Sequence, residues 1–171
     1  ANLLTKSDFC APNVYHKACA IGSIKCLKLA KDLCSTLVID QHCIDGAVEG
    51  GHSAIIEFGE TVLHQEMIPN QLAVDTAAGN GKLKMLEEKC NKWTLFPTSS
   101  SANTAAKHGH LDVLKWLKRQ KIFPDEQGAS DAAMNGHLDV LKWLKRQKIL
   151  PDEQGANNAA RSGHLDVLKW L

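Results

Sequence analysis

Apolar residues recur along the chain in two helical stripes that alternate through six units. The register is set by a glycine that returns in every unit, at Gly22, Gly51, Gly81, Gly109, Gly136 and Gly163. Apolar residues stand seven, four and three positions before each glycine, and a second stripe follows at the fourth and fifth positions after it. Such spacings place side chains on one face of a helix. Each unit is therefore predicted to be a short helix, a turn at the glycine and a longer helix.

The second stripe is nearly a copy of itself in the last three units. Gly109–Leu117 returns unchanged at 136–144 and at 163–171, a spacing of 27 residues, whereas the earlier glycines lie 28 to 30 residues apart. Self-similarity at a fixed period of this size is typical of stacked supersecondary units. We predict an all-α solenoid of stacked helix-turn-helix repeats. Residues 1–171 are expected to form a single repeat domain, cut from a longer chain.

The links between units also follow a pattern. Pro124 and Pro151 come after the longer helix and are expected to end it, and the Asp-Glu pairs that follow favour the start of the next helix. Units two and three depart from the pattern. Ser53, Gly59 and the Glu88–Lys89 pair replace apolar residues there, so these units are expected to contact their neighbours less tightly.

Charge is nearly balanced, with 20 basic and 19 acidic residues and a formal net charge of +1. No global field therefore attracts the chain to nucleic acid or anionic lipid. The basic residues Lys118, Arg119 and Lys121 fall where a helix C-terminus favours cations; the alternative is a row that binds phosphate. No apolar run approaches the ~20 residues of a membrane span. We expect a cytoplasmic protein, and a signal peptide removed before Ala1 stays an open alternative.

The six cysteines contain no Cys-x-x-Cys pair. Cys19 and Cys26 fall at apolar repeat positions, which favours small buried side chains in a reducing compartment. A metal site or a set of disulfides near the N-terminus is the alternative, because the cysteine count is even.

The sequence predicts no enzyme, no cofactor and no metal site. It has no glycine-rich phosphate loop, nucleophile elbow or His-Glu-x-x-His motif. The histidines that follow the recurring glycine (His52, His110, His137 and His164) occupy one repeat position. Catalysis needs groups that converge on one site, so this series indicates a repeated structural role. His108 and His110 alone are a weak signal for a metal.

Two blocks carry a family resemblance. Residues 13–22, with His16, Ala18 and Gly22, resemble the first-helix signature of ankyrin repeats, and Gly109–Leu117 resembles the start of that family's second helix. No unit has the family's Thr-Pro, and the later units replace His16 with Asp45, Asp75, Asn103, Ser130 and Asn157. The period is also shorter than the ~33 residues of ankyrin repeats. The family's β-hairpins are therefore expected to be shortened or absent.

The resemblance implies a non-enzymatic scaffold or adaptor that binds a partner protein on its concave face. Units four to six share their second stripe yet differ on the polar face of the preceding helix. The predicted partner-binding residues are Thr104, Lys107, His108, Asp131, Met134, Asn135, Asn158, Arg161 and Ser162. Neutral sequence drift between the repeat copies would also produce differences at these positions. Other functions kept open are a targeting or substrate-recognition module of a larger enzyme, a host-directed effector, and nucleic-acid or membrane binding through the basic rows.

Overall fold

The computed structural model describes residues 12–34 and 37–171. Within these residues all regular structure is helical, with no strand, so the predicted all-α class is confirmed. The helices form successive pairs, one around each recurring glycine. They are α2 (Pro12–Ala20) and α3 (Ile24–Leu33), α4 (Gln41–Gly50) and α5 (Ser53–Thr61), α6 (Gln71–Gly79) and α7 (Leu83–Trp93), α8 (Ser99–Lys107) and α9 (Leu111–Arg119), α10 (Glu126–Met134) and α11 (Leu138–Lys145), α12 (Glu153–Arg161) and α13 (Leu165–Trp170).

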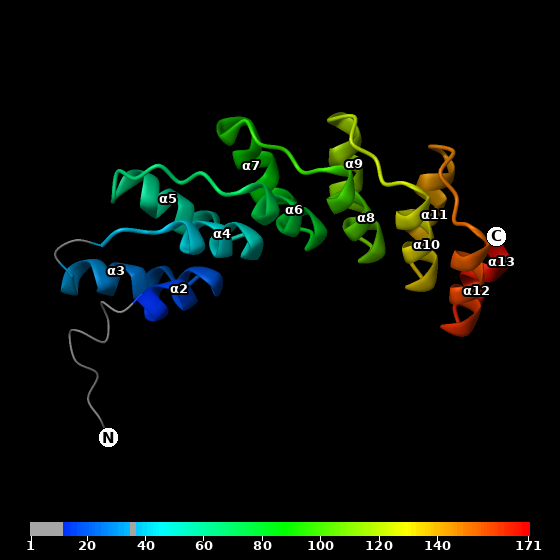
Figure 1. Cartoon of the computed structure of the whole chain (residues 1–171), viewed down its shortest axis with the longest axis horizontal. Helices are drawn as coiled ribbons and strands as arrows, with labels where there is room; N and C mark the ends of the chain where they lie inside the picture. The colour runs from blue at the N-terminus through cyan, green and yellow to red at the C-terminus, as the bar shows by residue number, and fades with distance from the viewer. Residues whose placement is uncertain (1–11, 35–36) are drawn as a thin grey trace, which may run out of the picture.

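The pairs stack side by side into an elongated arc (Figure 1). The first helices of neighbouring pairs contact one another far more extensively than the second helices do. Because the first helices lie closer together, they occupy the inner side of the arc, along its lower edge in Figure 1. We call the exposed surface of α4, α6, α8, α10 and α12 the inner face.

Small residues on the first helices make this close approach possible. The alanines four positions before the recurring glycine are at most 3% exposed in every unit. The second helices supply the bulk of the core, including the fully buried Leu114, Leu117 and Leu144. Trp116 and Trp143 are almost completely buried, whereas Trp170 in the last pair is half-buried. Small residues therefore set the spacing of the first helices, and large residues fill the space behind them.

The recurring glycines adopt the predicted left-handed conformation, with φ between 73° and 77°. The histidine at the start of the second helix of the next unit packs against most of them. A methyl group added to Gly109 would lie 2.6 Å from His137 Nδ1, and Gly81 and Gly136 stand in the same relation to the histidine of the following unit. At Gly163 nothing lies within 4 Å of such a methyl group. The glycine is thus required both by the backbone and by the neighbouring unit.

The second helices end differently from the prediction. α9 ends at Arg119 and α11 at Lys145, well before Pro124 and Pro151. The chain leaves the helical path at Lys121 and Lys148, which have φ of 62° and 64°. Turn hydrogen bonds such as Ile122 N–H to Leu117 C=O close these ends. As a result, the second helix is not generally the longer of each pair, and the prolines lie in the link beyond it.

Units two and three compensate for their irregular residues. The space beside Gly59 is filled by Met67, which comes from the following link and is 1% exposed. In unit three, α7 extends to Trp93, which is 5% exposed. Glu60, in the last turn of α5, forms ion pairs with Lys89 and Lys92 of α7. Met67, from outside the repeat register, therefore fills the space beside Gly59, and ion pairs of Glu60 connect α5 with α7.

Candidate partner-binding surface on the first helices

Polar side chains cap the start of four of the first helices. The side chains of Asp40, Asn70, Asp125 and Asp152 accept backbone N–H hydrogen bonds from the first turns of α4, α6, α10 and α12. Such caps satisfy donors that a helix start leaves unpaired. The hydrogen bond with Asn103 lowers the pKa of Asp125, and backbone N–H groups of its own helix lower it further. The expected negative charge at these helix starts is thus held in place as a cap.

Each cap is also bound by the preceding unit. Asp45 accepts from the Asn70 backbone N–H at 2.9 Å, and Asn103 accepts from the Asp125 N–H at the same distance. The equivalent pairs in the other units are His16 with Asp40, Asp75 with Thr98, and Ser130 with Asp152. These bridges link successive first helices and fix their relative placement. We call each of them a joint.

The sequence prediction missed the joints, although a signal was present. The residue six positions before the recurring glycine is polar in all six units, and a capping residue follows 22 to 25 positions later in five of them. From the sequence alone, these residues differ from the family signature and give no indication of which residue they contact. A polar residue at one fixed repeat position, followed at a nearly constant distance by a capping residue, indicates paired polar groups.

The structure brings the nine predicted binding residues together along three adjacent helices. Thr104 and Lys107 belong to α8, Asp131 and Met134 to α10, and Asn158 and Arg161 to α12. The remaining three, His108, Asn135 and Ser162, are the C-terminal caps of the same helices. Because these first helices are neighbours, equivalent positions follow one another along the inner face.

Several of these side chains already have partners within the chain. His108 Nδ1 lies 2.9 Å from the Gly79 carbonyl oxygen, and Asn135 donates to the Asp131 carbonyl at 2.8 Å. Thr104 is half-buried because its methyl group lies against Gly79. Lys107 and Arg161 are exposed, and Met134 is half-buried. These three, at the same repeat position, are therefore the best placed to meet a partner.

A shallow groove of about 230 Å³ extends this surface toward the N-terminus. It lies between α6 and α8 and includes Asp75, Asn80 and Thr104. Leu72 also lines it and is 71% exposed. Residue Leu72 was not predicted, because the comparison between repeats was confined to units four to six. An exposed leucine among polar neighbours is the kind of side chain that protein partners bury.

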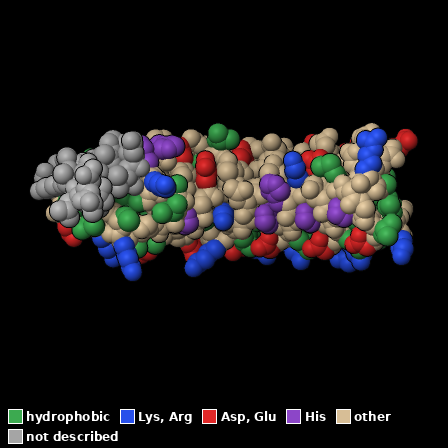
Figure 2. All heavy atoms as spheres, turned by 90° about the horizontal axis from the view of Figure 1, so that it is seen from below, with side chains coloured by type: hydrophobic (Ala, Val, Ile, Leu, Met, Phe, Trp, Pro, Cys, Tyr) green, Lys and Arg blue, Asp and Glu red, His purple; other side chains and the backbone are tan. Residues whose placement is uncertain are grey.

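The histidines after the recurring glycine have the structural role expected of them. His52 Nε2 lies 3.0 Å from the Ala20 carbonyl oxygen of the preceding unit. Figure 2 shows histidine side chains in a row along the face seen from below. Burial lowers the pKa of His110, and the neighbouring His108 adds to the effect. No carboxylate or thiol in the described part of the chain joins His108 and His110 in a three-ligand group.

The second helices carry charges of both signs. Lys115 and Lys142 are exposed, and Asp112 and Asp139 open the same helices. Lys or Arg and Asp or Glu side chains alternate along the lower edge of Figure 2. Alternation of this kind gives weak net attraction to a polyanion.

The cysteines divide into several environments. Cys19, Cys43 and Cys90 are free and buried, and burial raises the pKa of Cys90 to about 12. A hydrogen bond with Cys19, together with burial, raises the pKa of the Cys43 thiol. Cys26 is free but exposed, so its expected burial is wrong. Cys34 is disulfide-bonded, and Cys10 lies outside the residues that the structure describes.

Comparison with known proteins identifies the repeat. Residues 103–144 and 129–171 each match the family model described as ankyrin repeats (many copies). No curated protein matches the chain. The matched region covers α8 to α13 and hence all nine predicted binding residues.

Proposed function

This chain belongs to the ankyrin repeat family through the repeats at residues 103–171, and from that premise we propose that it binds a partner protein along its inner face. Ankyrin repeats generally mediate protein–protein interaction, and the family is typically non-catalytic. The proposed role is that of a scaffold or adaptor. The contact residues would be the nine predicted ones, extended by Leu72 in the groove between α6 and α8.

One observation carries this proposal. Units four to six keep the same nine residues from Gly109, Gly136 and Gly163 onward, yet their first helices differ at exposed and half-buried positions that lie next to one another. Selection for stacking alone would favour similar residues on both helices. A preordered surface that varies from unit to unit suits recognition of one extended partner, because little conformational entropy is lost on binding.

The test replaces one inner-face side chain in each of units four to six. Lys107→Glu, Met134→Ala and Arg161→Glu are expected to weaken binding of a partner captured from the native cell, by up to ~2 kcal/mol at a hot spot. Each should change stability by no more than ~0.5 kcal/mol, because these side chains lie outside the core. Titration of the purified partner against each variant measures the loss.

The matched control is Lys115→Glu combined with Lys142→Glu on the second helices. This pair is expected to leave the partner's affinity unchanged. If the control loses binding while the inner-face variants retain it, the assignment of the surface is wrong. A steep decrease of affinity with salt would then support binding through the basic rows, since release of counterions drives contact with polyanions.

We propose a cytoplasmic location. The described part of the chain has no helix long and apolar enough to cross a membrane. Among the described residues, four free thiols support a reducing compartment, whereas the disulfide at Cys34 favours an oxidising one. Imaging of the tagged protein in its native cell distinguishes the two.

A further inference from the structure

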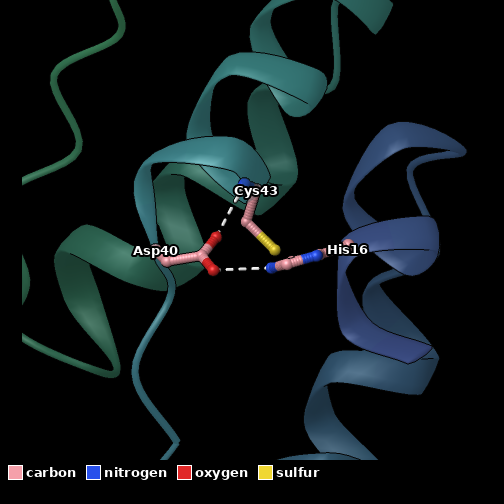
Figure 3. Close-up of side chains that lie close together, drawn as sticks. All are labelled: His16, Asp40 and Cys43. Carbon is pink, nitrogen blue, oxygen red and sulfur yellow. Dashed lines mark hydrogen bonds and ion pairs between the residues drawn. The ribbon is translucent and has the colours of Figure 1, made fainter. Parts of the chain in front are cut away.

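Three different metal-ligand groups meet at the joint between the first two units. His16 projects from α2, Asp40 caps α4, and Cys43 lies in the first turn of α4 (Figure 3). His16 Nε2 lies 2.6 Å from Asp40 Oδ2, and Asp40 Oδ1 accepts the Cys43 backbone N–H at 3.0 Å. The imidazole nitrogen, the carboxylate oxygen and the thiol sulfur all lie within 4.8 Å of one another.

The other joints show that the fold does not require this combination. At the three equivalent positions the second joint has Asp45, Asn70 and Ala73, and the fourth has Asn103, Asp125 and Gly128. Both bridge successive first helices and cap the next one, without an imidazole or a thiol. A polar bridge and a small residue are therefore sufficient for stacking. Only the first of the described joints combines an imidazole, a carboxylate and a thiol.

We propose that His16, Asp40 and Cys43 form a binding site for one divalent zinc ion. Imidazole, carboxylate and thiolate are the three ligand types that zinc takes from proteins. At the usual bond lengths, tetrahedral coordination separates neighbouring ligand atoms by roughly 3.4–3.6 Å. On binding, the distance between His16 Nε2 and Asp40 Oδ2 would increase by roughly 1 Å. The longer distances among the three ligand atoms would decrease by a similar amount. Rotation of the side chains accomplishes such shifts without moving either helix.

Exposure and charge both suit an ion that enters from solvent. The side chains of His16 and Asp40 are 23% and 47% exposed, while Cys43 is fully buried. The ion therefore reaches the buried sulfur through a polar opening, and water completes its coordination on the open side. Binding transfers the Cys43 thiol proton to solvent, so that one thiolate and one carboxylate balance the two positive charges.

The site would join two repeat units. One ligand belongs to α2 and two belong to the start of α4, so the ion would hold the first helices of both units together. Zinc that binds only the folded chain also raises the thermal midpoint. A zinc ion at this joint differs from the sequence-based prediction of no metal site. It corresponds to the alternative of a metal site near the N-terminus that involves a cysteine.

The experiment titrates the full chain with zinc chloride in a calorimeter and with cobalt chloride in a spectrophotometer. Oxygen is excluded, so that the free thiols stay reduced and the disulfide at Cys34 stays intact. We expect one zinc ion per chain. Bound cobalt should show a thiolate-to-metal charge-transfer band and the visible bands of tetrahedral coordination. Zinc should raise the thermal midpoint, and removal by EDTA should restore the original value.

Two variants use residues that the chain itself places at equivalent joints. His16→Asn copies Asn103, and Cys43→Ala copies Ala73, so both should fold with unchanged helical circular dichroism. Each is expected to raise the Kd for zinc by more than the ~10–100-fold typical for loss of an outer-shell partner, since it removes a ligand. The Cys43→Ala variant should also lack the charge-transfer band.

The control is Cys26→Ala, which removes an exposed free thiol outside the site and should leave the Kd and the cobalt spectrum unchanged. Absence of zinc binding by the wild-type chain under these conditions overturns the proposal. So does a zinc Kd that is the same in Cys43→Ala as in the wild type. A cobalt spectrum without the charge-transfer band would likewise exclude Cys43 as a ligand.

Discussion

At the scale of single residues, the recurring glycine meets two separate constraints. Its positive φ favours a residue without a Cβ atom, and the histidine of the next unit occupies the space in which a Cβ would lie. Gly109 carries both constraints, because His137 packs on it. Gly163 carries only the first. The chain therefore contains its own comparison between backbone strain and steric contact.

We expect Gly109→Ala to lower the free energy of unfolding by more than the ~1–2 kcal/mol that a left-handed backbone costs an alanine. The excess should come from displacement of the His137 ring. In a His137→Ala background, Gly109→Ala should cost less than in the wild type, and urea unfolding of the four proteins measures this coupling. Gly163→Ala is the reference for backbone strain alone. A cost for Gly109→Ala that is independent of His137 would show that the ring is not constrained by the glycine.

At the scale of helices, the irregular second unit shows how the stack tolerates a missing side chain. Gly59 stands where units four and five have a buried leucine, yet no space is left beside it, because Met67 enters from the following link. Methionine suits this role, since its unbranched side chain adapts to irregular spaces. Glu60 adds a polar connection, with Lys92 and Lys89 at 2.8 and 3.1 Å. Burial alone would raise the pKa of Glu60, but hydrogen bonds from these lysines outweigh it and lower the pKa.

The Met67→Ala substitution is expected to destabilise the chain by about 2–4 kcal/mol, because it removes a buried side chain and leaves a cavity beside Gly59. Denaturant unfolding followed by circular dichroism measures the change. The adjacent residue provides the control: Ile68 is 43% exposed, and Ile68→Ala should change stability by no more than ~0.5 kcal/mol. Similar effects for the two substitutions would mean that Met67 does not fill the core.

At the scale of the whole molecule, each helical pair is stabilised mainly by its neighbours. Pairs α8–α9 and α10–α11 have a neighbour on both sides, and their alanines are fully buried. In the last pair of this chain, α12–α13, the equivalent Ala160 is exposed and Leu165 is 65% exposed. Stability in such a stack is approximately a sum of unit and interface contributions, so it should vary along the molecule.

Hydrogen exchange of the 171-residue chain should reveal this variation. We expect the backbone amides of α8 to α11 to exchange more slowly than those of α12 and α13, because local opening of the last pair breaks one interface and opening of an inner pair breaks two. Mass spectrometry of peptides from the two regions provides the comparison, and the identical second-helix sequences serve as an internal control for intrinsic exchange rates. Equal protection in both regions would indicate that the chain opens as one cooperative unit.

The sequence by itself determined the class of the fold and the order of its parts. A stripe of small residues before each glycine and of large residues after it can be buried only if helical pairs stack, and the six glycines marked the turns. The predicted surface residues fell on neighbouring first helices for the same reason. All of these features depend on spacing within one unit and on repetition of that unit, and both can be read directly from the chain.

Only the tertiary structure decided which residues meet between units. The bridge from His16 to Asp40, the packing of His137 on Gly109 and the filling of the space at Gly59 by Met67 join positions whose proximity depends on how one pair lies against the next. The sequence also did not predict that α9 ends at Arg119 and that Lys121 adopts a left-handed conformation. Lysine gives no local signal for that conformation. Local patterns fix the helices, whereas contacts between units are fixed by the three-dimensional packing that those helices produce.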